Sequence, residues 1–189
     1  MILFINACIR EHSRTKYLAE ILLSKLGYTY EEVDLGTLDF PVIDETYLQK
    51  REQLIQEGKV TDPILSAARQ FAEAELIVIA APYWDLSFPA ILKRYLEQIN
   101  VVGITFRYTP DGIPEGLCRA KKLYYVQTAG GEYVPEIFGY GYVRALAQTF
   151  YGIPETELIQ AVGLDIRGAD TDKILNECAC GILSAEERT

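Results

Sequence analysis

The chain has little of several residue types that common enzyme classes require. Only one of its 189 residues is a histidine, His12. This excludes a histidine-dependent hydrolase site elsewhere in the chain and a zinc site with several histidines. No apolar run comes near the roughly 20 residues that cross a bilayer. The cysteines lack the spacing of a disulfide framework, and we interpret them as free thiols; they are Cys8, Cys118, Cys178 and Cys180.

Positive charge is also scarce. The 18 Lys and Arg residues are outnumbered by 27 Asp and Glu residues, which gives a net charge of −9. Such a surface repels phosphate backbones and anionic membranes, so we expect no nucleic-acid and no membrane partner, although a local basic pocket for a small anion is compatible with it. The apolar N-terminal stretch has no basic residue before it and soon reaches Arg10 and Glu11, which is not typical of a signal peptide. We therefore expect a cytoplasmic protein.

The composition is that of an ordinary globular protein. Hydrophobic residues make up 49% and charged residues 24% of the chain, and its length suits one domain with a sizeable core. No repeat or Ser/Gly-rich linker interrupts it, so residues 1–189 are expected to form a single domain. Thirteen Tyr, seven Phe and one Trp are compatible with a core, with flat ligands, or with both.

Hydrophobic segments of strand and helix character alternate along the chain. Strands are predicted at 2–6, 29–35, 76–81, 122–128 and 158–162, and helices at 13–26, 45–58, 62–74, 90–100, 136–151 and 170–183. Residues 103–118 contain a turn signature between two short extended pieces. This alternation predicts an α/β protein: a five-stranded parallel sheet with helices on both faces. Small molecules bind such sheets at the carboxyl ends of the strands, which draws attention to the loops 7–15, 82–89 and 128–133.

The first loop contains residues that suit a phosphate-binding site. Ser13 suits the N-cap of the helix that follows, so backbone N–H groups and the helix dipole would face its concavity. Ser13 and Thr15 add hydroxyl groups, and Arg14 or Arg10 can add positive charge. The alternative is a plain N-cap with solvated arginines.

The same loop also satisfies the Cys-x5-Arg-Ser/Thr pattern of protein tyrosine phosphatases and related arsenate reductases, through Cys8, Arg14 and Thr15. There a thiolate attacks phosphorus while the arginine clamps the phosphoryl oxygens. Against this alternative, the loop has no glycine and carries Glu11. The Asp-Pro pair that supplies the general acid near the C-terminus of those enzymes has no counterpart, because the Asp62-Pro63 pair lies mid-chain.

The other two loops suit a flat heterocycle. Residues 82–89 place aromatic side chains and two prolines after the most apolar strand, where they could form apolar walls or simply close the edge of the core. Gly130 and Gly131 would let the backbone approach a ligand closely. There is no Gly-x-Gly-x-x-Gly and no Walker A sequence, so neither a Rossmann dinucleotide site nor a P-loop is supported.

Taken in order, four segments resemble the flavodoxin-fold NAD(P)H:quinone oxidoreductases, and most closely the bacterial FMN-dependent NADH azoreductases. The segments are Ser13-Arg14-Thr15, Pro82-Tyr83-Trp84-Asp85, ITFRYTPDGIPEGL at 104–117, and Thr128-Ala129-Gly130-Gly131. The resemblance implies a flavodoxin-like domain that binds FMN and takes electrons from NADH or NADPH. It then passes two electrons by a ping-pong route to quinones, azo compounds or nitroaromatics, with the chemistry borne by the flavin, no catalytic side chain and no metal. It also implies a homodimer with shared active sites.

The resemblance further implies a set of cofactor contacts. The serine-containing turn would hold the FMN phosphate, with Cys8 where many relatives have serine; the 82–86 loop would contact the isoalloxazine through backbone amides, and the 128–133 loop its pyrimidine edge. The implied residues are Cys8, Ser13, Arg14, Thr15, Pro82, Tyr83, Trp84, Asp85, Leu86, Thr128, Ala129, Gly130, Gly131 and Tyr133. Asp85 stands where relatives commonly have Asn, and Ala129 where they have a larger residue. A flavodoxin that only transfers electrons is the alternative, which the extra segment 103–118 and the aromatic loop disfavour.

Overall fold

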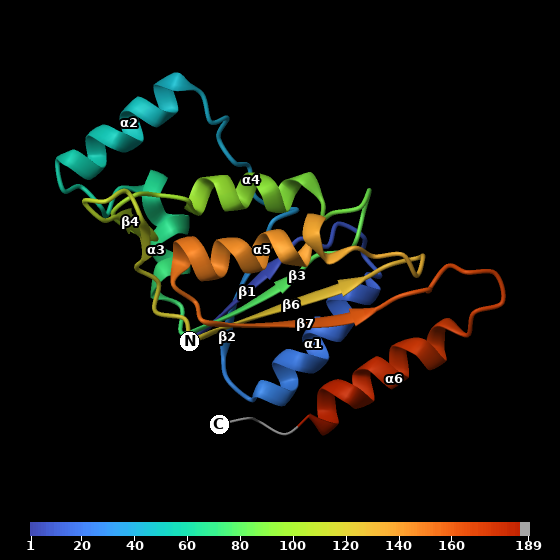
Figure 1. The fold of residues 1–189 in the computed structure, drawn as a ribbon. Coiled ribbons are helices and arrows are strands. Elements are labelled where there is room, and N and C mark those ends of the chain that lie inside the picture. Colours follow the sequence, from blue (N-terminus) through green and yellow to red (C-terminus); the bar gives the residue numbers. More distant parts are fainter. Residues whose placement is uncertain (186–189) are drawn as a thin grey trace.

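The computed structural model describes residues 1–185, and a five-stranded parallel sheet forms its centre (Figure 1). Its strands are β1 (Ile2–Asn6), β2 (Tyr30–Asp34), β3 (Leu76–Ala80), β6 (Lys122–Thr128) and β7 (Glu155–Ala161), in the spatial order β2-β1-β3-β6-β7. Counted among themselves, the strands follow the order 2-1-3-4-5 of the flavodoxin-like fold. The predicted fold class is confirmed.

β1 and β3 lie side by side near the middle of the sheet and are apolar on both faces. β1 pairs in parallel with both β2 and β3, with Ile5 level with Val33 and Ile79. Every residue of β1 is buried, which is why its sequence shows a continuous apolar run rather than alternation. Successive residues therefore feed two separate cores: Leu3 and Ile5 lie in one, Ile2 and Phe4 in the other.

Helices cover both faces of the sheet, as Figure 1 shows. α1 (Arg14–Leu26) and α6 (Thr171–Ser184) pack on one face, and α3 (Ser66–Glu73), α4 (Ala90–Ile99) and α5 (Tyr140–Leu146) on the other. The side chain of Ser13 caps α1 by accepting a hydrogen bond from the Lys16 N–H, and Gly27 ends the helix at φ 66°. Within the described residues, no helix is both long and apolar enough to span a membrane.

α2 (Glu45–Gln56) stands apart from the sheet, at the top left of Figure 1. Asp44 caps it by accepting a hydrogen bond of 2.8 Å from the Tyr47 N–H. It contacts the body through a small third core in which Leu54 meets Leu65, Ala68 and Val101, and through the buried Tyr47, whose hydroxyl donates to Gln98 Oε1. This helix therefore depends on few apolar contacts.

The sequence-based prediction differs from the structure in three places. The helix predicted over 62–74 opens with a 3-10 turn (Pro63–Leu65) capped by Asp62, and α3 begins only at Ser66. Residues 136–151 were expected to be one helix, but a 3-10 turn (Glu136–Phe138) precedes α5 and a π-helical turn (Ala147–Tyr151) follows it. Gly139, at φ −117° and ψ −100°, interrupts the helical backbone at the first junction. β7 begins three residues before the predicted 158, because its first residues, Glu155 to Glu157, are polar and lie on an edge strand that pairs only with β6.

The turn-bearing segment 103–118 forms an antiparallel hairpin of β4 (Phe106–Tyr108) and β5 (Pro114–Gly116). The ring of Phe106 packs edge-on against Phe150 in the π-helical turn, with centroids 4.7 Å apart. Gly116 comes so close to this turn that a Cβ there would lie 2.1 Å from the backbone nitrogen of Gly152. The backbone of the hairpin therefore packs directly against the backbone of the π-helical turn.

We expect the substitution Gly116→Ala to lower the free energy of unfolding by about 3 kcal/mol or more, because the added methyl group can be accommodated only by separating two backbones. The measurement is urea denaturation followed by circular dichroism. Gly131→Ala is the matched control, since a Cβ at Gly131 meets nothing within 4 Å. Equal stability of the two variants would contradict the close approach of hairpin and turn.

Candidate functional site

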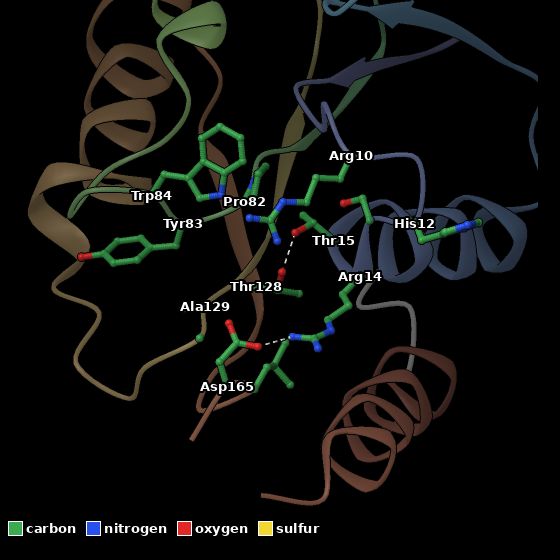
Figure 2. Close-up of a pocket in the computed structure, with 13 residues that line it drawn as sticks. Arg10, His12, Arg14, Thr15, Pro82, Tyr83, Trp84, Thr128, Ala129 and Asp165 are labelled. Carbon is green, nitrogen blue, oxygen red and sulfur yellow. Dashed lines mark hydrogen bonds and ion pairs between the residues drawn. The ribbon is translucent and has the colours of Figure 1, made fainter. Parts of the chain in front are cut away.

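Four loops meet at the carboxyl edge of the sheet and enclose a cavity of about 320 Å³. The loops follow β1, β3, β6 and β7, so the cavity lies at the switch point between β1 and β3 where ligands of such sheets bind. Its volume is within the range of small-molecule sites, about 300–1,000 Å³. The lining residues, most of them visible in Figure 2, are Arg10, His12, Ser13, Arg14, Thr15, Pro82, Tyr83, Trp84, Thr128, Ala129, Gly130, Leu164 and Asp165.

The start of α1 forms one wall of the cavity. Thr15 is buried, and its hydroxyl shares a hydrogen bond of 2.6 Å with the hydroxyl of Thr128 at the end of β6 (Figure 2). The Ser13 hydroxyl accepts the N-cap hydrogen bond from the Lys16 N–H and lies beside the Cys8 thiol. As a hydroxyl it can also donate one hydrogen bond to a ligand. The first-turn N–H groups of α1 and its dipole add partial positive charge at this wall.

Positive side chains dominate the cavity although the chain as a whole is acidic. Arg10 places its guanidinium carbon 5.9 Å from the centroid of the Trp84 ring, and Arg14 lies at the opposite side of Thr15. Arg14 Nη1 forms an ion pair of 2.7 Å with Asp165 Oδ1, the one carboxylate among the lining residues. The cavity therefore favours an anion.

The loop after β3 contains a tight and strained turn. The N–H groups of Trp84 and Ser87 each donate to the carbonyl of the other residue, at 3.0 and 2.7 Å. The two residues between them have positive φ values, 50° at Asp85 and 67° at Leu86. A left-handed conformation costs a residue other than glycine about 1–2 kcal/mol. Such strain is typical of functional sites, where surrounding contacts maintain it.

The loops after β6 and β7 are joined by backbone hydrogen bonds. The Leu164 N–H donates to the Ala129 carbonyl at 3.2 Å, and the Asp165 N–H to the Gly130 carbonyl at 3.0 Å. A Cβ at Gly130 would lie 2.5 Å from Asp165 Oδ2. The glycine therefore makes room for the carboxylate of the neighbouring loop.

Most of the sequence-predicted contact residues come together in this cavity. Those that line it are Ser13, Arg14, Thr15, Pro82, Tyr83, Trp84, Thr128, Ala129 and Gly130. Cys8, Asp85, Leu86, Gly131 and Tyr133 lie outside the lining; Asp85 and Leu86 belong to the strained turn beyond the rim, and Tyr133 is largely exposed.

The sequence-based set omitted four lining residues: Arg10, His12, Leu164 and Asp165. Arg10 and His12 lie in the first loop, where the sequence indicates Arg10 as a source of positive charge but gives no signal for His12. Leu164 and Asp165 follow the last strand of the sheet. That strand is parallel to the others, so its carboxyl end lies at the same edge of the sheet. Considering the loop after it as a candidate ligand-binding loop would have identified both residues.

Cys8 is buried and does not line the cavity, although the Ser13 side chain lies beside its thiol and partly offsets the effect of burial on the thiol's pKa. Its Sγ lies 3.7 Å from the Ala80 carbonyl oxygen, and burial raises the pKa of the thiol to about 11. At neutral pH the thiol is therefore protonated, whereas phosphatase chemistry needs a thiolate. Arg14 is turned to Asp165 rather than toward Cys8. The geometry does not favour the phosphatase alternative.

Comparison with known proteins is consistent with this geometry. The family model for the flavodoxin-like fold matches residues 1–183. An FMN-dependent NADH:quinone oxidoreductase of Clostridium beijerinckii is 37% identical over 180 residues, which cover 91% of this chain and 89% of the relative. One from Coprothermobacter proteolyticus is 35% identical over 176 residues, which cover 88% and 87%. The crystal structure of an azoreductase from Bacillus anthracis superposes with a TM-score of 0.81 at 26% identity, covering 97% of this chain and 99% of that one.

Proposed function

We propose that this chain, which belongs to the family with the flavodoxin-like fold, binds FMN in the cavity at the β1/β3 edge and is an FMN-dependent NADH:quinone oxidoreductase. The observation that carries the proposal is a cationic cavity at the start of α1, at the point of the sheet where this fold binds its ligands. The names of the relatives and of the similar azoreductase support quinones and azo compounds as acceptors.

The residues present fit the two ends of FMN. A phosphate suits the first turn of α1, where Ser13 and Thr15 carry hydroxyls and Arg10 and Arg14 carry positive charge. A flat ring suits the wall formed by Pro82 to Trp84, and Gly130 has no side chain to obstruct it. From the rest of the predicted set we place the backbone of Asp85 and Leu86 beside the ring.

The protein's own contribution is binding and orientation. FMN, when bound, would supply the two-electron chemistry, accepting hydride from NADH or NADPH and delivering it to the acceptor. We assign no catalytic side chain. The hydrogen bond between Thr15 and Thr128 and the one from the Tyr83 N–H to the Thr128 carbonyl hold three walls of the cavity in fixed positions. We also place the protein in the cytoplasm, without nucleic-acid or membrane partners, in agreement with its net charge of −9.

The proposal is tested with the purified chain supplied with FMN. We expect a yellow protein that NADH bleaches under anaerobic conditions and that a quinone or azo dye restores to yellow. A yellow protein inert to both NADH and NADPH would indicate an electron-transfer flavodoxin. A colourless protein that cleaves p-nitrophenyl phosphate would indicate a phosphatase, and either result would overturn the proposed activity.

Ser13→Gly is expected to weaken FMN binding by about 1.5 kcal/mol, the contribution of one hydrogen bond to a charged group. Glycine serves as an N-cap almost as well as serine, so the free energy of unfolding should fall by only a few tenths of a kcal/mol. The measurement is the quenching of FMN fluorescence on titration. Ser24→Ala, at an exposed position of the same helix, is the control and should bind FMN as the wild type does.

We further propose that the chain is a homodimer whose copies share their active sites. Exposed apolar side chains gather beside the cavity: Tyr133 is 80%, Ile137 71% and Phe138 51% exposed. The Ser87 hydroxyl donates to the Phe138 carbonyl at 2.6 Å, which joins this surface to the strained turn and to Leu86. An apolar surface of this kind is typical of a contact between proteins. A second copy is the occupant that would complete the cavity's rim.

Sedimentation velocity at micromolar concentration is expected to show a dimer. Ile137→Asp should shift it to monomers and abolish quinone reduction, because burying an unpaired carboxylate in the contact has a large desolvation cost. Tyr28→Asp is the control, an exposed residue between α1 and β2 that should leave both dimer and activity intact. A wild-type monomer with full activity would contradict the shared site.

A further inference from the structure

The ion pair between Arg14 and Asp165 occupies the anion-binding side of the cavity. Arg14 is the first residue of α1, beside the capping Ser13, and Asp165 lies in the loop that connects β7 to α6. Arg14 Nη1 and Asp165 Oδ1 are 2.7 Å apart, and both residues line the cavity (Figure 2). The carboxylate of Asp165 thus holds a cation that an anionic ligand of this cavity would also need.

The backbone of Asp165 is held in place independently of Arg14. Its N–H donates to the Gly130 carbonyl, and its Oδ2 lies only 2.5 Å from the position that a Cβ on Gly130 would take. On either side, the Gly163 N–H donates to the Gly131 carbonyl and the Leu164 N–H to the Ala129 carbonyl. The Thr171 hydroxyl also donates to the Leu164 carbonyl at 2.9 Å. The backbone of Asp165 therefore keeps its carboxylate within reach of the cavity when Arg14 turns to another partner.

We propose that Asp165 is a specificity-determining residue whose carboxylate competes with the ligand's phosphate for Arg14, so that it weakens the binding of phosphorylated flavin and leaves riboflavin binding unchanged. The proposal rests on the proposed function. A phosphate monoester carries more negative charge than a carboxylate, and Arg14 meets Asp165 through one nitrogen only, so a phosphate that engages the guanidinium with two oxygens displaces Asp165 from it. The displaced carboxylate then remains near the dianion and repels it.

The exposure of the pair sets the size of the effect. The side chain of Arg14 is 42% exposed and that of Asp165 is 68% exposed, so water screens their attraction. Exposed pairs of this kind change an equilibrium constant by up to about fivefold. The competition is therefore weak enough for the phosphate to win, and strong enough to be measured.

The test compares Asp165→Asn with the wild type in the flavin-free full-length chain, titrated with FMN and, separately, with riboflavin, by flavin fluorescence. We expect Asp165→Asn to bind FMN about fivefold more tightly at low salt, and riboflavin with less than a twofold change. Asp172→Asn is the matched control: it removes one negative charge from an exposed position in the first turn of α6 and should change neither affinity. In an Arg14→Gln background, the gain from Asp165→Asn should fall by at least half.

Weaker or unchanged FMN binding in Asp165→Asn would overturn the inference, as would an equal gain for riboflavin or for Asp172→Asn. An undiminished gain in the Arg14→Gln background would also overturn it, because the competition would then not be for Arg14. If the wild type binds neither flavin, the proposed function fails as well. Binding of FMN by the wild type with no difference in Asp165→Asn refutes only the role of Asp165.

Discussion

The burial of β1 on both faces is the constraint on which the rest of the molecule depends. An apolar strand with neighbours on either side, β2 and β3, needs helices above and below it, and parallel pairing obliges the chain to cross over between strands. The helix after β1 packs on one face of the sheet and the helix after β3 on the other, so the loops that lead to them diverge at the carboxyl edge. The cavity occupies that separation, and the chemistry around it is a consequence of how the core is covered.

The electrostatics of the cavity are local and run against those of the whole chain. A net charge of −9 opposes anionic ligands at long range, but salt screens interactions beyond about 8–10 Å. Within that distance, the first turn of α1 and two arginines make the electrostatic potential of the cavity positive, and one carboxylate reduces it. An acidic protein can therefore hold a phosphate when a helix end and a few side chains converge on it.

The sequence was informative where local physical chemistry decides structure and less so where distant segments meet. The continuous apolar runs predicted β1, β3 and β6 closely, and Ser13 and Gly27 marked the ends of α1 through capping preferences that need no tertiary contact. The start of β7 escaped notice because partly exposed polar residues of an edge strand carry no hydrophobic pattern. Gly139 is a local signal against a continuous helix, but isolated glycines are also tolerated inside helices, so the sequence did not locate the break.

The same distinction explains the candidate site. The loops after β1, β3 and β6 could be identified as neighbours from topology alone, and most of their predicted residues line the cavity. The burial of Cys8 and the approach of Asp165 to Gly130 depend on side-chain directions and on contacts between residues far apart in sequence. Periodicity and spacing contain no information about either.

The strained turn at Asp85 and Leu86 has a consequence for laboratory evolution of this protein. Selection for heat resistance alone would favour glycine or asparagine at these two positions, since either residue relaxes a left-handed backbone. Selection for turnover would act on the same codons for another reason, because they shape the mouth of the cavity. A library screened for both properties would therefore reveal at these positions whether the backbone strain is maintained by selection on the active site.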